Sequence, residues 1–157
     1  MKTWLVTWNP ARYAWDNPYL GYAALRREIA LNGSAAGGWT CSNTKSIRKW
    51  DRVFLLKQGA RPRGIVAGGY AASDSYGTPH PDPVRAAAGK AVQRVDILWD
   101  RILDIDAGEI FPQDILKILG PGYNWSPMGS GVSVPDEIAQ RIEEVWQKDY
   151  MNQEALT

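Results

Sequence analysis

The first ten residues constrain the fold most, because they describe a strand that ends at a definite point. Residues 4–8 read Trp-Leu-Val-Thr-Trp, so the two tryptophans and the valine face one side of a sheet and the other two residues face the opposite side. Asn9 and Pro10 follow directly, and proline, which has no amide hydrogen for a ladder, favours a turn there. The sequence therefore predicts a strand whose end brings Trp8 and Asn9 together to the edge of a sheet.

A second segment places another aromatic side chain among small polar ones. Gly37 and Gly38 predict a flexible hinge, and the residues after it are Trp39, Thr40, Cys41, Ser42 and Asn43. An aromatic face beside converging hydrogen-bonding groups is what a pocket for a planar heterocycle requires. The end of the first strand and the residues around Trp39 are therefore candidate walls of one pocket.

The tryptophan content is high, with eight tryptophans in 157 residues. Three are predicted to be core residues, because they lie among aliphatic residues at strand-like or helix-like positions: Trp4, Trp99 and Trp146. Four are candidates for a binding surface, because they lie beside Pro, Gly, Asn or Ser: Trp8, Trp15, Trp39 and Trp125.

Length and composition predict one soluble domain spanning residues 1–157, with a frayed end over 152–157. The N-terminus has none of the regions of a signal peptide, so a cytoplasmic protein is expected. Cys41 is the single cysteine, which excludes an internal disulfide, and we expect it to pack as a small apolar residue. With His80 as the single histidine, a dedicated zinc site is unfavourable, and neither a metal nor another cofactor is expected.

The net charge of +1 is unevenly distributed. One short stretch holds seven cations: Lys45, Arg48, Lys49, Arg52, Lys57, Arg61 and Arg63. Such a stripe fits local contact with phosphates, and it equally fits a solvated face with ordinary ion pairs. Lys45, Arg48 and Lys49 are the candidate phosphate-binding residues, because they follow the candidate pocket most closely.

Alternation and turn residues predict an α+β fold of about five to six strands, curved into a sheet or pseudo-barrel with helices packed outside. After the first strand, further strands are expected at 52–57, 64–72, 90–103 and 132–134. Helices are expected from Pro18 to a stop at Asn32-Gly33 with Asn17 as N-cap, over 111–119, and from Pro135 onward. Residues 73–83 and 122–131 are expected to be loops.

Several of these segments, in this order, resemble an EVE domain of the PUA-like superfamily. The matching segments are Trp4–Pro10, Trp39–Ile47, Asp51–Gly59, Pro62–Gly69 and Asn124–Gly131. The likeness is greatest to EVE-like modules joined to HNH endonucleases in modification-dependent restriction. It implies a non-catalytic module that binds DNA carrying a modified base, flips that base into an aromatic cage, and acts with an HNH or other nuclease effector. Methylated or hydroxymethylated cytosine is the favoured base, and N6-methyladenine, through kinship with YTH domains, is second.

By this resemblance Asn9 and Trp39 line the base pocket, with Thr40, Ser42 and Trp8 nearby. Related domains place a second cage aromatic after a histidine, but no tryptophan follows His80 here. The resemblance therefore leaves either Tyr76 or Trp15 to complete the cage, with His80 as a further pocket residue, or a cage that is more open.

Other interpretations of the same residues stay open. Asn9 also fits a turn residue that bonds its own backbone, and Trp39 also fits a plug at one end of a barrel. An RNA-binding PUA-like protein is an alternative, as is a metal-dependent nucleic-acid hydrolase that uses Asp96, Asp100 and Asp104. On a strand, each four-residue step separates such carboxylates by about 13 Å. We therefore interpret the Asp group as solvent-facing strand positions.

Overall fold

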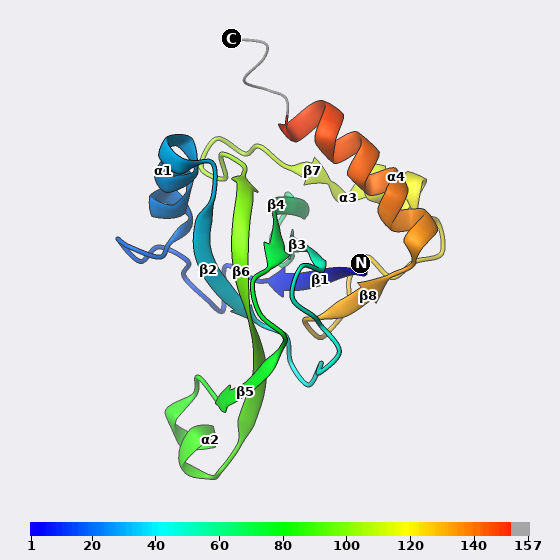
Figure 1. Cartoon of the computed structure of the whole chain (residues 1–157). Coiled ribbons are helices and arrows are strands. Elements are labelled where there is room, and N and C mark those ends of the chain that lie inside the picture. The colour runs from blue at the N-terminus through cyan, green and yellow to red at the C-terminus, as the bar shows by residue number, and fades with distance from the viewer. Residues whose placement is uncertain (152–157) are drawn as a thin grey trace.

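An open, curved sheet organises the chain in the computed structural model, which describes residues 1–151 (Figure 1). The predicted frayed end over 152–157 lies outside the described residues. The strands are β1 (Thr3–Trp8), β2 (Ala35–Thr40), β3 (Arg52–Lys57), β4 (Gly64–Ala71), β5 (Tyr76–Pro79), β6 (Ala91–Ile102), β7 (Phe111–Pro112) and β8 (Val132–Val134). The helices are α1 (Tyr22–Asn32), α2 (Pro83–Ala87), α3 (Gln113–Leu119) and α4 (Asp136–Trp146), which continues into a π-helical turn over Gln147–Met151.

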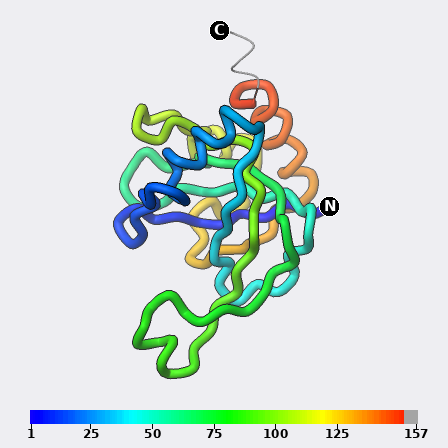
Figure 2. Tube along the Cα trace, turned by 60° about the vertical axis from the view of Figure 1, so that its left-hand side comes forward, coloured from blue at the N-terminus to red at the C-terminus, as the bar shows by residue number. Residues whose placement is uncertain are grey.

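The sheet has the order β2-β6-β4-β3-β1-β8, with β5 paired to β6 and β7 paired to β4. β1 runs parallel to β3, and the other pairs are antiparallel. The predicted α+β class is confirmed. The sheet has eight strands rather than five to six, partly because the expected loop over 73–83 contains β5 and the expected helix over 111–119 begins with β7. β5 and α2 form an extension that projects away from the body of the sheet (Figure 2).

The alternation of β1 divides the core into two layers. Trp4, Val6 and Trp8 belong to one buried cluster, which also contains Trp39 of β2, whereas Leu5 belongs to the other. The second cluster lies between the sheet and the helices α3 and α4. The predicted faces of the first strand are therefore confirmed.

The predicted glycine hinge is wrong, because residues 35–40 form β2 and pair along their whole length with β6. A Cβ atom on Gly37 would lie 2.8 Å from Nε1 of Trp99, and one on Gly38 would lie 2.9 Å from Nη2 of Arg94. The glycines therefore allow large side chains of β6 to pack against the strand rather than giving the backbone freedom to move.

The first helix begins later than predicted, at Tyr22 rather than Pro18. The side chain of Asn17 accepts hydrogen bonds from the backbone amides two and three residues further on, so it caps a turn before the helix. The predicted end is confirmed, since Gly33 adopts the left-handed conformation with φ of 83°.

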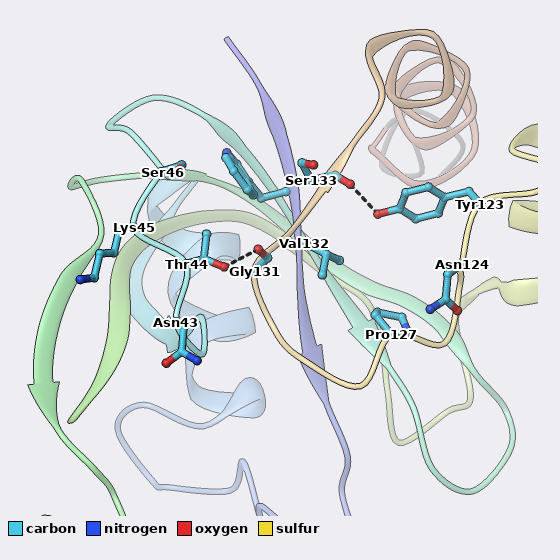
Figure 3. A pocket seen from close by; sticks show the side chains of 11 residues that line it. Asn43, Thr44, Lys45, Ser46, Tyr123, Asn124, Pro127, Gly131, Val132 and Ser133 are labelled. Atoms are coloured by element: carbon cyan, nitrogen blue, oxygen red, sulfur yellow. Dashed lines mark hydrogen bonds between the residues drawn. The ribbon is translucent and has the colours of Figure 1, made fainter. Parts of the chain in front are cut away.

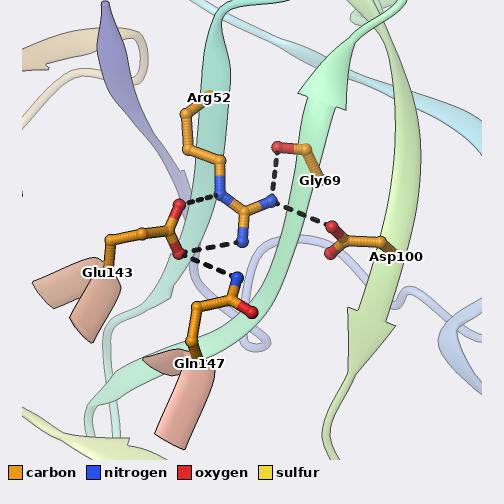
Figure 4. Close-up of polar contacts among 5 residues, drawn as sticks. All are labelled: Arg52, Gly69, Asp100, Glu143 and Gln147. Atoms are coloured by element: carbon orange, nitrogen blue, oxygen red, sulfur yellow. Dashed lines mark hydrogen bonds and ion pairs between the residues drawn. The ribbon is translucent and has the colours of Figure 1, made fainter. Parts of the chain in front are cut away.

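A buried arginine ties the sheet to the last helix (Figure 4). Arg52, at the start of β3, is 1% exposed, and its guanidinium donates to both carboxylate oxygens of Glu143 in α4, at 2.8 and 3.2 Å. It also donates to Oδ2 of Asp100 in β6 at 3.2 Å and to the carbonyl of Gly69 in β4 at 3.0 Å. Asp100 is therefore not a solvent-facing position as predicted, and burial raises its pKa although Arg52 acts in the opposite direction.

We expect Arg52→Met to lower the free energy of unfolding by about 3–5 kcal/mol, because it leaves two carboxylates without their buried cation. Urea unfolding followed by tryptophan fluorescence measures this change. Arg27→Met, at an exposed position of α1, is the matched control and is expected to change stability by about 0.5 kcal/mol or less. Equal effects of the two substitutions would show that the Arg52 contacts do not stabilise the fold.

A second buried charge holds the beginning of β1. The carboxylate of Asp51 accepts hydrogen bonds from Nε1 of Trp4 at 2.9 Å and from the amides of Lys2 and Arg48 at 3.1 and 3.0 Å. Burial raises the pKa of Asp51, but these hydrogen bonds and the nearby α-amino group outweigh burial, so the pKa lies below its ordinary value of 3.8. The folded state therefore favours the ionised carboxylate.

Because folding lowers this pKa, the Asp51 carboxylate stabilises the native state above about pH 4, and the contribution is lost as the pH falls through the folded-state value. We expect Asp51→Asn to cost about 1–3 kcal/mol near neutral pH, with the cost shrinking on acidification. Urea midpoints of both proteins, measured from about pH 7 downward, test this. A difference that does not vary with pH would contradict the assignment.

Candidate functional site

A cavity of about 620 Å³ opens where β1 and β2 end, and we call it the β1-end cavity. Four of the predicted pocket residues line it: Trp8, Asn9, Trp39 and Thr40. Its other lining residues come from the neighbourhood of these four and from distant segments of the chain: Thr7, Arg12, Tyr13, Gly38, Gln58, Pro81, Arg94, Ser126, Pro127 and Met128. The structure therefore brings the two sequence segments that predicted a pocket to one place.

Trp39 lies at a seam of the curved sheet. β2 and β1 are separated by β6, β4 and β3 in the strand order, yet Nε1 of Trp39 donates to the carbonyl of Thr7 at 2.9 Å. The ring of Tyr13 meets the indole edge to face at 5.5 Å, and that of Trp15 at 5.0 Å. Trp39 is 7% exposed and fills the end of the curved sheet, which agrees with the predicted plug, and it also lines the cavity. Its predicted role as a stacking wall stays a prediction.

Two amide side chains set the polar character of the cavity. Oδ1 of Asn9 accepts from the amide of Ala11 at 3.0 Å, so Asn9 is a turn residue, and its NH₂ group is the part available to a ligand. Nε2 of Gln58 donates to the carbonyl of Pro127 at 3.0 Å, which leaves Oε1 as an acceptor. The NH₂ group of Asn9 and Oε1 of Gln58 thereby keep hydrogen-bonding capacity in two side chains that line the cavity.

The cavity is electropositive. Arg12 and Arg94 line it, and no carboxylate from residues 1–151 does. Sequence reasoning missed both arginines, as well as Tyr13, Gln58 and Met128. Arg12 and Tyr13 lie just beyond the Asn9-Pro10 turn, which is a local signal, whereas the others come from segments that only the fold brings near.

The remaining predicted pocket residues do not line the cavity. Trp15 is 3% exposed and packs behind Trp39. Oγ of Ser42 accepts from the amide of Ser130. The hydroxyl of Tyr76 donates to Asp96, and Nδ1 of His80 accepts from the amide of the residue two positions later, although the neighbouring Pro81 is a lining residue.

The candidate Trp125 belongs to the core, as does Cys41. Trp125 is 2% exposed and lies in the cluster beneath α3 and α4. Cys41 is fully buried as expected, and burial raises the pKa of its thiol to about 11, so the thiolate needed for a nucleophile is unfavourable.

A second hollow of similar size shares the lining residue Pro127 with the β1-end cavity. Asn43, Thr44, Lys45 and Ser46 form one side, and the segments around Tyr123 and Val132 form the other (Figure 3). Within residues 1–151 its lining has no carboxylate.

Of the predicted phosphate-binding residues, Lys45 lines this second hollow. Arg48 lies beside it and donates from Nη1 to the backbone carbonyls of Lys45 and Ile47. Nζ of Lys49 lies 5.3 Å from the ring of Trp50 instead.

The three carboxylates of the hydrolase alternative have different partners. Asp96 accepts from Tyr76, Asp100 pairs with Arg52, and Asp104 lies 3.8 Å from Arg26. No group of three His, Cys, Asp or Glu side chains in the described part of the chain is placed to hold a metal ion. None of its helices combines the length and the apolar composition needed to span a membrane.

No model of a protein family matches this sequence, and no curated protein matches it. Solved structures do share the fold. A hypothetical protein from Leishmania major superposes with a TM-score of 0.63 at 12% identity, covering 100% of this chain and 98% of its own. Proteins from Pseudomonas syringae and Pseudomonas putida give TM-scores of 0.58 and 0.57 at 16% and 15% identity, each covering 91% of this chain and 98% of their own. At these identities the similarity establishes the fold alone.

Proposed function

We propose that this protein is an EVE-type domain of the PUA-like superfamily that reads a modified base in DNA, by accepting that base, flipped out of the duplex, in the β1-end cavity. The observation that carries the proposal is the convergence of Trp8, Asn9, Trp39 and Thr40 on one electropositive cavity. The resemblance of the sequence to such modules supports the same assignment.

The cavity suits a single planar base. Its volume of about 620 Å³ lies within the range typical of small-ligand sites. One aromatic platform contributes about 1–3 kcal/mol of stacking to a flipped base. The hydrogen bonds made by the indole nitrogens of Trp8 and Trp39 hold the walls before the ligand arrives, so little ordering entropy is lost on binding.

The polar groups suit a base that carries an exocyclic amine. Oε1 of Gln58 can accept from such an amine, and the NH₂ group of Asn9 can donate to a ring nitrogen or carbonyl. Cytosine and adenine both present this pair, so these groups do not choose between them. We favour 5-methylcytosine or 5-hydroxymethylcytosine, followed by N6-methyladenine, because of the endonuclease-linked and YTH-like resemblances.

Arg12 and Arg94 at the cavity, with Lys45 and Arg48 at the second hollow, supply the sequence-independent part of binding. Phosphate contacts of this kind position a duplex, whereas the pocket reads the modification. In this proposal the module is non-catalytic, and cleavage belongs to a fused or partner nuclease.

The proposal is tested by a binding panel in which one duplex carries each modified base in turn, with RNA and unmodified DNA as further arms.

We expect Trp39→Leu to weaken binding to the preferred modified duplex roughly 5- to 150-fold, with much less effect on unmodified DNA, because stacking acts on the flipped base alone. A 2-aminopurine next to the target reports flipping, since it brightens as stacking is lost.

Trp39→Phe retains an aromatic platform but loses the indole hydrogen bond to Thr7, so its affinity for the preferred duplex is expected to lie between those of the wild-type protein and Trp39→Leu. Trp125→Leu, which alters the other core layer, controls for general destabilisation. Equal reductions in affinity for modified and unmodified duplexes, or a 2-aminopurine signal that stays dark on binding, would overturn the proposal. Preference for RNA over every DNA duplex would favour an RNA-binding protein instead.

We further expect the double substitution Lys45→Glu and Arg48→Glu to lower affinity for all duplexes alike. The dependence of log K on log salt is expected to flatten by about 0.9 for each phosphate that the variant no longer neutralises. Fluorescence anisotropy between about 50 and 200 mM salt measures both effects. Lys148→Glu with Arg141→Glu, exposed on α4 and its π-helical extension, is the charge-matched control. An unchanged salt slope would show that the second hollow does not contact DNA phosphates.

A further inference from the structure

Met128 is fully exposed at the rim of the β1-end cavity, with a relative exposure of 105%. Tyr13, an exposed aromatic residue that also lines the cavity, is 52% exposed and packs edge-on against Trp39, so it belongs to the cavity wall. Met128, in contrast, directs its whole thioether chain into solvent beside the opening. An apolar side chain placed in this way is available to a ligand that covers the cavity mouth.

The loop that carries Met128 is fixed on both sides of it. Before it, the carbonyl of Pro127 accepts from Gln58 at 3.0 Å. After it, Ser130 receives a hydrogen bond at its hydroxyl from the amide of Thr7, donates that hydroxyl to the carbonyl of Thr40, and donates its amide to Ser42, at 3.0, 2.8 and 2.9 Å. The exposure of Met128 is therefore held by the ends of β1 and β2 and is not the result of a loose loop.

We propose that Met128 is a wedge that enters the base stack at the place vacated by the flipped nucleotide, an inference that rests on the proposed function. Extruding a base leaves a gap in the stack, and the lost stacking opposes flipping. Proteins that distort DNA fill such gaps with apolar side chains, methionine among them. An unbranched, polarizable thioether chain adapts to the irregular space between two bases.

Position separates Met128 from Trp50, an exposed aromatic residue elsewhere on the surface. Trp50 is 60% exposed, and its backbone has a φ of 77°, but its amide donates to the carbonyl of Ala71 near the beginning of β1 and β3. The cavity lies at the opposite end of β1, where Thr7, Trp8 and Asn9 line it. A base seated against Trp39 leaves its gap near the cavity mouth, where Met128 stands and Trp50 does not.

The test compares Met128→Ala, Met128→Leu and Ile118→Ala, the last at a position of α3 that is 73% exposed and outside the cavity lining. Each protein is titrated with 5-methylcytosine, and in parallel with N6-methyladenine, in a paired duplex, in a duplex lacking the partner base, and in a single strand. We expect Met128→Ala to weaken binding to the paired duplex about tenfold and to leave single-strand binding unchanged, because a single strand has no gap to fill. Met128→Leu and Ile118→Ala are expected to match the wild-type protein on every substrate.

The outcomes separate the two proposals. If the wild-type protein prefers neither modified duplex to unmodified DNA, the proposed function fails, and the wedge fails with it. A second outcome is that the wild-type protein prefers a modified duplex while Met128→Ala binds the paired duplex as tightly as the wild-type protein does. That result overturns the wedge proposal alone. If Met128→Ala weakens binding to the paired duplex and to the single strand equally, Met128 contacts the base itself, and the wedge proposal is again wrong.

Discussion

The hydrogen bond from the indole of Trp39 to the carbonyl of Thr7 is the contact on which the site depends. It joins the ends of β2 and β1, which the strand order separates by three intervening strands. The sheet must curve for these ends to meet, and the cavity lies where they meet. Ser130 reinforces the same seam by linking Thr7 and Thr40. A ligand pocket at this place thus shares its walls with the closure of the fold, which makes those walls rigid.

Curvature in turn depends on small residues placed opposite large ones. Gly37 and Gly38 allow Trp99 and Arg94 to lie against β2, where a Cβ atom would meet them within 3 Å. On the other face, Gly68 lies beneath Trp146 of α4. Seven of the eight tryptophans are buried, and these glycines create some of the space that they occupy. The high tryptophan content therefore serves packing first, and Trp39 and Trp8 serve the cavity in addition.

The cations of the basic stretch have different physical roles. Arg52 is buried and balances Glu143 and Asp100, so it belongs to the architecture. Lys45 lines an open hollow and is free to meet a solution anion. The arginines at the cavity, Arg12 and Arg94, lie outside that stretch altogether. Local charge density along a sequence does not distinguish these roles, because burial decides whether a cation faces a carboxylate or water.

The sequence by itself determined the local elements whose signals are strong. Alternation and turn residues located β1, β3, β4, β6 and β8, and Asn9-Pro10 correctly placed Trp8 and Asn9 at a sheet edge. The tertiary structure decided what depends on partners: that residues 35–40 pair as a strand rather than hinge, and that Gln58, Arg94 and Met128 reach the same cavity. Periodicity records which face of its own element a residue occupies. It carries no information about which distant segment lies opposite, because that is fixed by the register and curvature of the sheet.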